Sequence, residues 1–386
     1  MTTTQQGIIT LLKSAVTGEK LPLPEGFDLS DAWPMIRKHS IAPLAFEGAV
    51  NCGIPRNDPA MQTLFQAYCR SLQHSEGQLR DLDRIFAAFE ETGIDYMPLK
   101  GVNMKPRYPR PELRPMGDAD ILIRMEQYET VRTIMTALGF FEKNETDHEL
   151  HWETPALHAE LHKRLIPSYN KDYDPYFGDG WQLGKIRDGH RHAMTPEDEL
   201  VYLFTHFAKH YRDGGIGTRH VLDLWVFLRT FPLVNETWAR GELEKLQLLE
   251  FYDNILRLID CWFGAGQWDE KMEILSDSIF ASGSFGPDAL RVISRAVRDT
   301  KHGGSGRLVY LWQMAFPSAM VLRDKYTVLK KAPWLLPAVW IYRPFYKVFR
   351  ERDSLKEKER HLEVLDEENI RARQQMLNYV GLDYNF

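Results

Sequence analysis

The stretch Gly117-Asp118-Ala119-Asp120-Ile121-Leu122-Ile123 places two carboxylates at the start of an apolar, β-branched run. Such a run predicts a short buried strand over residues 118–123. Side chains alternate between the two faces of a strand, so Asp118 and Asp120 are expected on the same side, with Cα atoms about 6.5 Å apart. Two carboxylates in this arrangement can share divalent cations, and protein-bound divalent cations are typical of phosphate chemistry.

The residues before this strand are expected to form a phosphate-binding turn. An amphipathic helix is predicted to end at Gly93, and a strand over Ile94–Leu99 then leads to Lys100 and Gly101. A glycine after a strand lets phosphate approach main-chain N–H groups, and the Lys100 ammonium can meet a triphosphate as a point charge. Arg114, in the proline-rich loop before residue 118, is placed to grip a phosphate or a base.

A third carboxylate is expected on a neighbouring strand, because a cation cage for phosphate chemistry commonly uses several carboxylates. Two strands are predicted over His148–Trp152 and Leu157–Leu165, on either side of a turn at Pro155. The second contains Glu160 in apolar alternation, and His162 faces the same side two residues later. Glu160 is therefore the predicted third metal ligand.

Four histidines lie in the same region and raise the question of a histidine metal site. These are His148, His151, His158 and His162. Histidines that alternate along strands are more often hydrogen-bonded structural residues, and we interpret these four in that way. A histidine metal site remains the alternative.

The segments that flank this core are predicted to be helical. Helices are expected over Met125–Leu138, Glu197–Tyr211 and Arg219–Arg229. Arg219 and Asp223 are one helical turn apart, which favours a structural ion pair. The segment from Trp334 to Phe349 mixes aromatic and basic residues, so we predict a buried helical hairpin, with contact to a membrane surface as the alternative.

These patterns divide the chain into four parts. We expect a helical N-terminal segment over residues 1–92, an α/β core over 93–195, a helical domain over 196–350 and a charged helical tail over 351–386. A flexible break is expected at Gly303–Gly306. The fold class is therefore α+β, with a small mixed sheet flanked by a helical N-terminal segment and a larger, mostly α-helical C-terminal domain.

The composition limits the classes of protein to which this chain can belong. The chain has 386 residues, of which 44% are hydrophobic and 26% charged, as in ordinary globular proteins. The formal net charge of −6 provides no global basic surface for nucleic acid. Three distant cysteines cannot form a disulfide framework, and neither a signal peptide nor a membrane span is apparent. We expect a cytoplasmic protein, and the oligomeric state stays open.

The motifs together resemble a known family. Leu99-Lys100-Gly101, Leu113-Arg114-Pro115-Met116-Gly117-Asp118-Ala119-Asp120 and Glu160-Leu161-His162 are similar to the uncharacterised nucleotidyltransferase family, a branch of the polymerase-β-type nucleotidyltransferase superfamily. The resemblance implies a nucleotidyltransferase core in which Asp118, Asp120 and Glu160 hold the metal. It also implies that Gly101 lies in the phosphate turn.

Three functions follow as hypotheses. The first is a nucleotidyltransferase that uses Mg²⁺ or Mn²⁺ and transfers NMP from an NTP to an acceptor, with release of pyrophosphate. Lys100, Gly101, Arg114 and His162 would contact the nucleotide or its metal. The acceptor is a small molecule, sugar, peptide or protein, and nucleic acid is less expected. The alternatives are a glycosyltransferase that uses Asp-x-Asp to bind a nucleotide-sugar, and a non-catalytic nucleotidyltransferase-like binding module.

Overall fold

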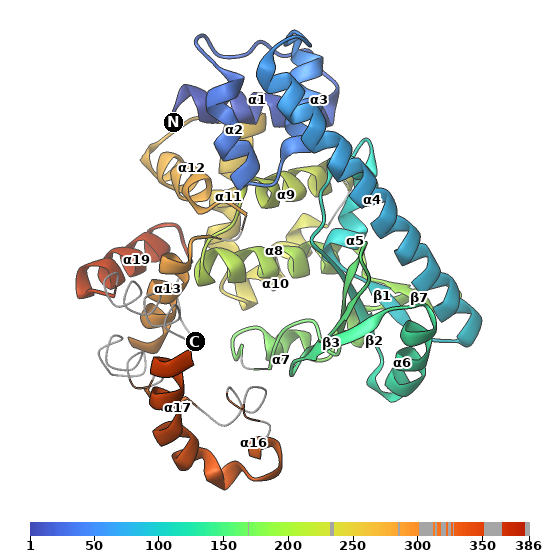
Figure 1. Ribbon diagram of the computed structural model, residues 1–386. Coiled ribbons are helices and arrows are strands. Elements are labelled where there is room, and N and C mark those ends of the chain that lie inside the picture. Colours follow the sequence, from blue (N-terminus) through green and yellow to red (C-terminus); the bar gives the residue numbers. More distant parts are fainter. Residues whose placement is uncertain are drawn as a thin grey trace. The chain divides into compact units, whose positions relative to one another are not determined.

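The computed structural model describes residues 1–168, 170–231, 235–284, 286–300, 312, 315–317, 322, 326, 328–350 and 365–382. The described residues form two compact units, one within residues 1–208 and 216–284 and one within residues 209–215 and 286–382. The first unit contains the whole sheet (Figure 1). The predicted four-part division remains a prediction.

Four helices precede the sheet, and local sequence sets where the longest one begins and ends. They are α1 (Thr3–Thr17), α2 (Leu29–Lys38), α3 (Ala42–Cys52) and α4 (Pro59–Thr92). Asp58 caps α4 by accepting the Ala60 backbone N–H at 2.7 Å, and Pro59 occupies the first helical position. Gly93 ends the helix in a left-handed conformation, with a φ of 72°. The predicted helix end at Gly93 is confirmed.

Seven strands form one mixed sheet in the order β3-β4-β5-β2-β1-β7-β6. They are β1 (Tyr96–Pro98), β2 (Asp118–Ile123), β3 (Phe141–Glu145), β4 (Glu149–Glu153), β5 (His158–His162), β6 (Lys185–Asp188) and β7 (Arg191–Ala193). Central β2 pairs in parallel with β5 and antiparallel with β1, while β4 pairs antiparallel with β5. The predicted strand at 118–123 is confirmed. The strands predicted over 94–99 and 157–165 are present but shorter, as β1 and β5, and the strand predicted over 148–152 begins and ends one residue later, as β4.

Short elements connect these strands. They are α5 (Lys100–Met104), η1 (Lys105–Arg107), η2 (Pro111–Leu113), η3 (Met125–Gln127), α6 (Tyr128–Ala137), α7 (Asp174–Phe177) and η4 (Trp181–Leu183). The helix expected over residues 125–138 is present as η3 followed by α6. The prolines of the loop after Tyr108 limit it to a single 3₁₀ turn at η2.

One face of the sheet packs into the hydrophobic core. Ala119, Ile121, Leu161 and Trp152 lie at alternate strand positions, and each is at most 1% exposed. Side chains from α4 and α6 complete this core, including Leu82 and Val131 on these two helices. Because strand side chains alternate, the intervening residues of β2, β4 and β5 must occupy the opposite face.

The remaining described helices of the first unit follow the sheet. They are α8 (Pro196–Asp213), which continues into the second unit, α9 (Thr218–Thr230), α10 (Glu236–Lys245), α11 (Leu249–Phe263) and α12 (Glu270–Ser282). His39, at the end of α2, is fully buried and connects two of them. Its Nδ1 accepts the Thr218 backbone N–H at 3.2 Å, and its Nε2 then donates to the Phe280 carbonyl at 3.1 Å.

The second unit is described in part. Its elements are α13 (Asp288–Thr300), α16 (Val328–Lys331), η5 (Pro333–Leu335), α17 (Leu336–Arg350) and α19 (Glu367–Tyr379). The Arg373 guanidinium of α19 donates to the Tyr211 carbonyl at 2.7 Å. The flexible break expected at Gly303–Gly306 lies outside the described residues, as do residues 351–364 of the predicted tail.

The predicted burial of the segment 334–349 is wrong for two of its large side chains. Trp334 and Ile341 are 75% and 71% exposed. Val339 packs with Leu322 and Leu329 in a small apolar cluster, so the apolar side chains described in α17 include buried as well as exposed ones. None of the helices in the described part of the chain is both long and apolar enough to cross a membrane.

We expect Ile123→Ala to lower the free energy of unfolding by about 2–5 kcal/mol, because it opens a cavity in the core. Ile123 is fully buried in β2. Ile186→Ala is the matched control, since Ile186 is 71% exposed in β6, and should change stability by less than about 0.5 kcal/mol. Urea unfolding measures both, and equal losses would contradict the assignment of the two faces.

His39 predicts a pH dependence of stability. Burial lowers the pKa of His39 from 6.5 to about 4, so the unfolded chain binds the proton more tightly in this interval. The histidine therefore contributes stability at pH 6.5 that is lost, at about 1.4 kcal/mol per pH unit, as the pH falls towards 4. His39→Gln should flatten the measured slope of unfolding free energy against pH. Parallel slopes for variant and wild type would contradict this.

Candidate active site on the polar face of the sheet

Three adjacent strands bring eight ionisable side chains to the face opposite the core. We call this set the polar face: Asp118, Asp120, Glu149, His151, Glu153, His158, Glu160 and His162. The strand register places Asp120 directly beside Glu160, and Glu160 directly beside His151 on the other side. The predicted same-side placement of Asp118, Asp120, Glu160 and His162 follows from this register.

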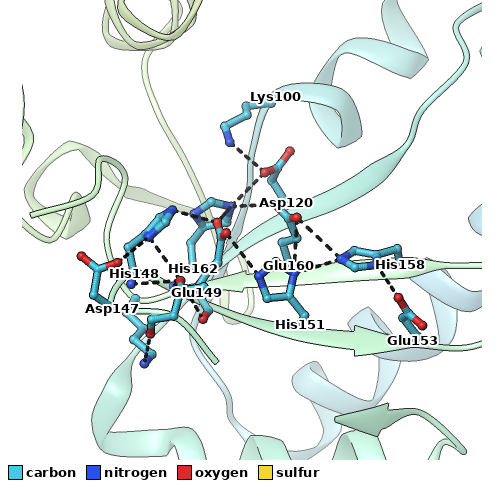
Figure 2. A network of polar contacts seen from close by, with 12 residues as sticks. Lys100, Asp120, Asp147, His148, Glu149, His151, Glu153, His158, Glu160 and His162 are labelled. Carbon is cyan, nitrogen blue, oxygen red and sulfur yellow. Dashed lines mark hydrogen bonds and ion pairs between the residues drawn. The ribbon is translucent and has the colours of Figure 1, made fainter. Parts of the chain in front are cut away.

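Asp120 is the most enclosed of the three predicted carboxylates. It is 5% exposed, and its Oδ1 accepts hydrogen bonds from Lys100 Nζ and from His162 Nε2, both at 2.8 Å (Figure 2). Burial raises the pKa of Asp120, but the charge of Lys100 and the bond from His162 outweigh it and hold the pKa well below its usual range. Asp120 is therefore ionised.

Lys100 and His162 both donate a hydrogen bond to Asp120, and their pKa values shift in opposite directions. Burial lowers the pKa of Lys100, but the carboxylate of Asp120 outweighs burial and raises it overall. Burial, with the nearby Lys100 charge, lowers the pKa of His162, whose buried Nδ1 has no hydrogen-bond partner among the described residues. The neutral ring with its proton on Nε2 satisfies the bond to Asp120. Lys100 has a φ of 43°, a strained backbone conformation for a residue with a side chain.

Asp118 and Glu160 are the two carboxyl groups of the site whose ionised forms are disfavoured. Asp118 makes neither a hydrogen bond nor an ion pair with any described residue, and its pKa is raised by burial and by Asp120. Burial, followed by the charges of Asp120, Glu149 and Asp118, raises the pKa of Glu160 to about 8. A cation between these carboxylates would favour their ionised forms.

Asp120, Glu160 and His162 each offer one donor atom, and these atoms lie within 4.8 Å of one another. Asp118 does not join this compact group within the described residues, although it shares their face of the sheet. The structure thus gathers two of the three predicted metal ligands with a histidine that was expected to contact the nucleotide.

Gly101 has a steric role in the structure. It lies in α5, and a Cβ atom built there would lie 2.7 Å from Arg114 Nη1 and 3.1 Å from Met116 Cγ. A side chain at this position would therefore displace the Arg114 guanidinium. The proposed contact of Gly101 with phosphate remains a prediction.

Arg114 is held by a residue that the sequence analysis assigned to another ion pair. Its Nε and Nη2 donate to the two carboxylate oxygens of Asp223 on α9, at 3.2 and 2.8 Å. Tyr108 also donates to Asp223, at 2.7 Å, while Arg219 donates instead to the Pro115 carbonyl at 3.0 Å. The predicted Arg219–Asp223 pair is therefore wrong, because a planar guanidinium from the loop matches the carboxylate at both oxygens.

Glu149 on β4 is a further residue of the site that was missed. It lies beside His162 in the register, 3.0 Å from His148 Nε2 and 3.3 Å from His151 Nε2. Burial raises the pKa of Glu149, but His148 outweighs burial and the pKa falls to about 2. The alternation of Glu149, His151 and Glu153 with apolar Leu150 and Trp152 was the available signal.

A scan against protein-family models matches residues 25–264 to a family described as an uncharacterised nucleotidyltransferase. The matched segment contains the whole sheet and the polar face. Searches of curated proteins and of solved structures found no match.

Lys100→Met should lower the free energy of unfolding by about 3–5 kcal/mol, because it leaves the Asp120 carboxylate buried without its cation. Adding Asp120→Asn in the same chain should restore much of the loss. Lys185→Met, at an exposed position in β6, is the matched control and should change stability by less than about 0.5 kcal/mol. Urea unfolding at neutral pH measures the wild type, the two single variants Lys100→Met and Asp120→Asn, the double variant and the Lys185→Met control. Strictly additive effects of the two substitutions would contradict the coupling.

Proposed function

The chain belongs to the uncharacterised nucleotidyltransferase family, and on this basis we propose that it transfers NMP from an NTP to an acceptor in a metal-dependent reaction. The observation that carries the proposal is the register that sets Asp120 beside Glu160, with Asp118 two positions earlier on the same face. Both the family and the site geometry support this chemistry over a glycosyltransferase, which remains the alternative.

The residues present fit a divalent cation. Mg²⁺ and Mn²⁺ prefer oxygen ligands, and Asp118, Asp120 and Glu160 supply carboxylates from two adjacent strands. Burial and the charges of neighbouring carboxylates raise the pKa values of Asp118 and Glu160, and a bound cation would relieve this repulsion. When bound, the metal would neutralise charge on the phosphates and on the leaving pyrophosphate.

The other residues of the site would bind and orient the nucleotide. The Lys100 ammonium lies beside Asp120, so it can meet a phosphate brought to these carboxylates. His162 fixes the Asp120 carboxylate through Nε2–H. Arg114, anchored by Asp223, would present its remaining Nη1 beside Gly101 to a phosphate or a base.

Proton removal from the acceptor is assigned to Glu160 or to the bound metal. Glu160 lies beside Asp120 on the same face of the sheet, and a metal held there would lower the pKa of an acceptor hydroxyl bound to it. The acceptor class stays open among small molecules, sugars, peptides and proteins.

We expect Asp120→Ala to abolish NMP transfer while the protein stays folded. The assay incubates the full-length protein, Mg²⁺ or Mn²⁺ and α-phosphate-labelled NTPs with a cell extract as the acceptor source, and measures pyrophosphate release and label transfer. Asp83→Ala, at an exposed position on α4, is the control and should retain wild-type transfer.

Three outcomes would count against the proposal. Full activity of Asp120→Ala would contradict the site assignment. Transfer from labelled nucleotide-sugars, with none from NTPs, would favour the glycosyltransferase. Calorimetry that detects no binding of Mg²⁺–NTP to the wild-type protein would favour a non-catalytic binding module.

A further inference from the structure

Two histidines on adjacent strands meet a carboxylate oxygen at one end of the polar face. Nδ1 of His151 and Nε2 of His158 are 3.0 Å apart. Oε1 of Glu160 lies 3.5 Å from the first of these nitrogens and 3.6 Å from the second (Figure 2). The three donor atoms therefore form a nearly equilateral triangle.

The size of this triangle suits a transition-metal ion. Zinc binds imidazole nitrogen and carboxylate oxygen at about 2.0–2.2 Å, and in a tetrahedral site such ligand atoms lie about 3.3–3.6 Å from one another. The observed separations, 3.0, 3.5 and 3.6 Å, are close to this range before any metal is added. An ion could be bound with little movement of the side chains.

The outer nitrogen of each ring faces a second carboxylate. His158 Nδ1 lies 2.9 Å from Glu153 Oε1, and His151 Nε2 lies 3.3 Å from Glu149 Oε1. Each neutral ring can donate its one proton to that carboxylate, which leaves a lone pair on the inner nitrogen. Carboxylates in this outer position are the usual partners of metal-bound histidines, because they fix the tautomer and the ring orientation.

The resulting arrangement directs three acceptors at one point. With both ring protons on the outer nitrogens, the inner nitrogens of His151 and His158 and the Oε1 of Glu160 converge on one point, which a metal ion can occupy in place of a shared proton. The three side chains are 16%, 32% and 17% exposed, so an ion can enter and a further ligand can reach it.

We infer that His151, His158 and Glu160 form a second metal site, which binds a divalent transition metal of the zinc class and keeps its fourth position open. Two imidazoles and one carboxylate favour zinc or cobalt over magnesium, which prefers oxygen ligands alone. This site is additional to the proposed cation site at Asp118, Asp120 and Glu160. Glu160 joins the two sites, since its Oε2 faces His162 at 3.9 Å while Oε1 faces the histidine pair.

Metal binding at the histidine pair requires no nucleotide, so it can be tested apart from the proposed transferase activity. The full-length protein, freed of metal with a chelator, is titrated with Co²⁺ in excess Mg²⁺, which occupies the oxygen-ligand site. We expect saturable binding with the visible absorption of four-coordinate Co²⁺, and displacement by Zn²⁺. Zn²⁺ should also raise the melting temperature of the wild-type protein, because it binds the folded state.

Variants locate the metal. Glu153→Gln keeps all three ligands and should weaken Co²⁺ binding by about 10- to 100-fold, through the outer contact to His158. His151→Ala and His158→Ala should lose more than that. His190→Ala is the matched control, because His190 pairs with Asp95 away from the polar face, and it should bind as the wild type does.

Two results would overturn the inference. The first is a wild-type protein that binds no Co²⁺ in excess Mg²⁺. The second is wild-type affinity in both His151→Ala and His158→Ala, with loss in His162→Ala instead, which would place the metal at the Asp120 group. If an alanine variant fails to fold, as shown by circular dichroism, Glu153→Gln decides the question, and unchanged affinity in that variant would count against the site.

Discussion

The ionised Asp120 carboxylate, held between Lys100 and His162, is the contact around which the site is arranged. A buried carboxylate is costly unless charge and hydrogen bonds compensate it, and both hydrogen bonds to Asp120 are 2.8 Å long. The contact joins the turn after β1 to β2 and to β5. It also gives a reason for the strained φ of Lys100, since the surrounding contacts must stabilise that conformation.

Because side chains alternate along the strands, one face of the sheet stabilises the fold and the other carries the candidate site. On one face Ile121, Leu161 and Trp152 pack into the core, and on the other the polar face gathers carboxylates and histidines. Because the two sets occupy alternate positions of the same strands, a register shift of one residue would exchange them and destroy both. The core thus maintains the register on which the proposed metal sites depend.

The carboxyl groups of the polar face differ in the partners that could compensate their charge. Asp120 has a lysine partner, whereas Asp118 has no ion-pair partner among the described residues and Glu160 faces histidines. This imbalance would favour the proposed binding of a cation, and the two proposed sites differ in the donors they offer. Oxygen ligands dominate at the Asp118 end, and ring nitrogens at the His158 end.

Local sequence determined a large part of this protein. Gly93 set the end of α4, an apolar, β-branched run located β2, and period two placed Asp118 and Asp120 on one side, because these features depend on neighbours in the chain. The resemblance to the nucleotidyltransferase family also rests on short local motifs, and the family model confirms it for residues 25–264. The tertiary structure alone decided the pairing of Arg114 with Asp223 and the grouping of Glu149, His151 and Glu153 with β5. Such contacts depend on strand order and helix packing across distant residues, which no local pattern specifies.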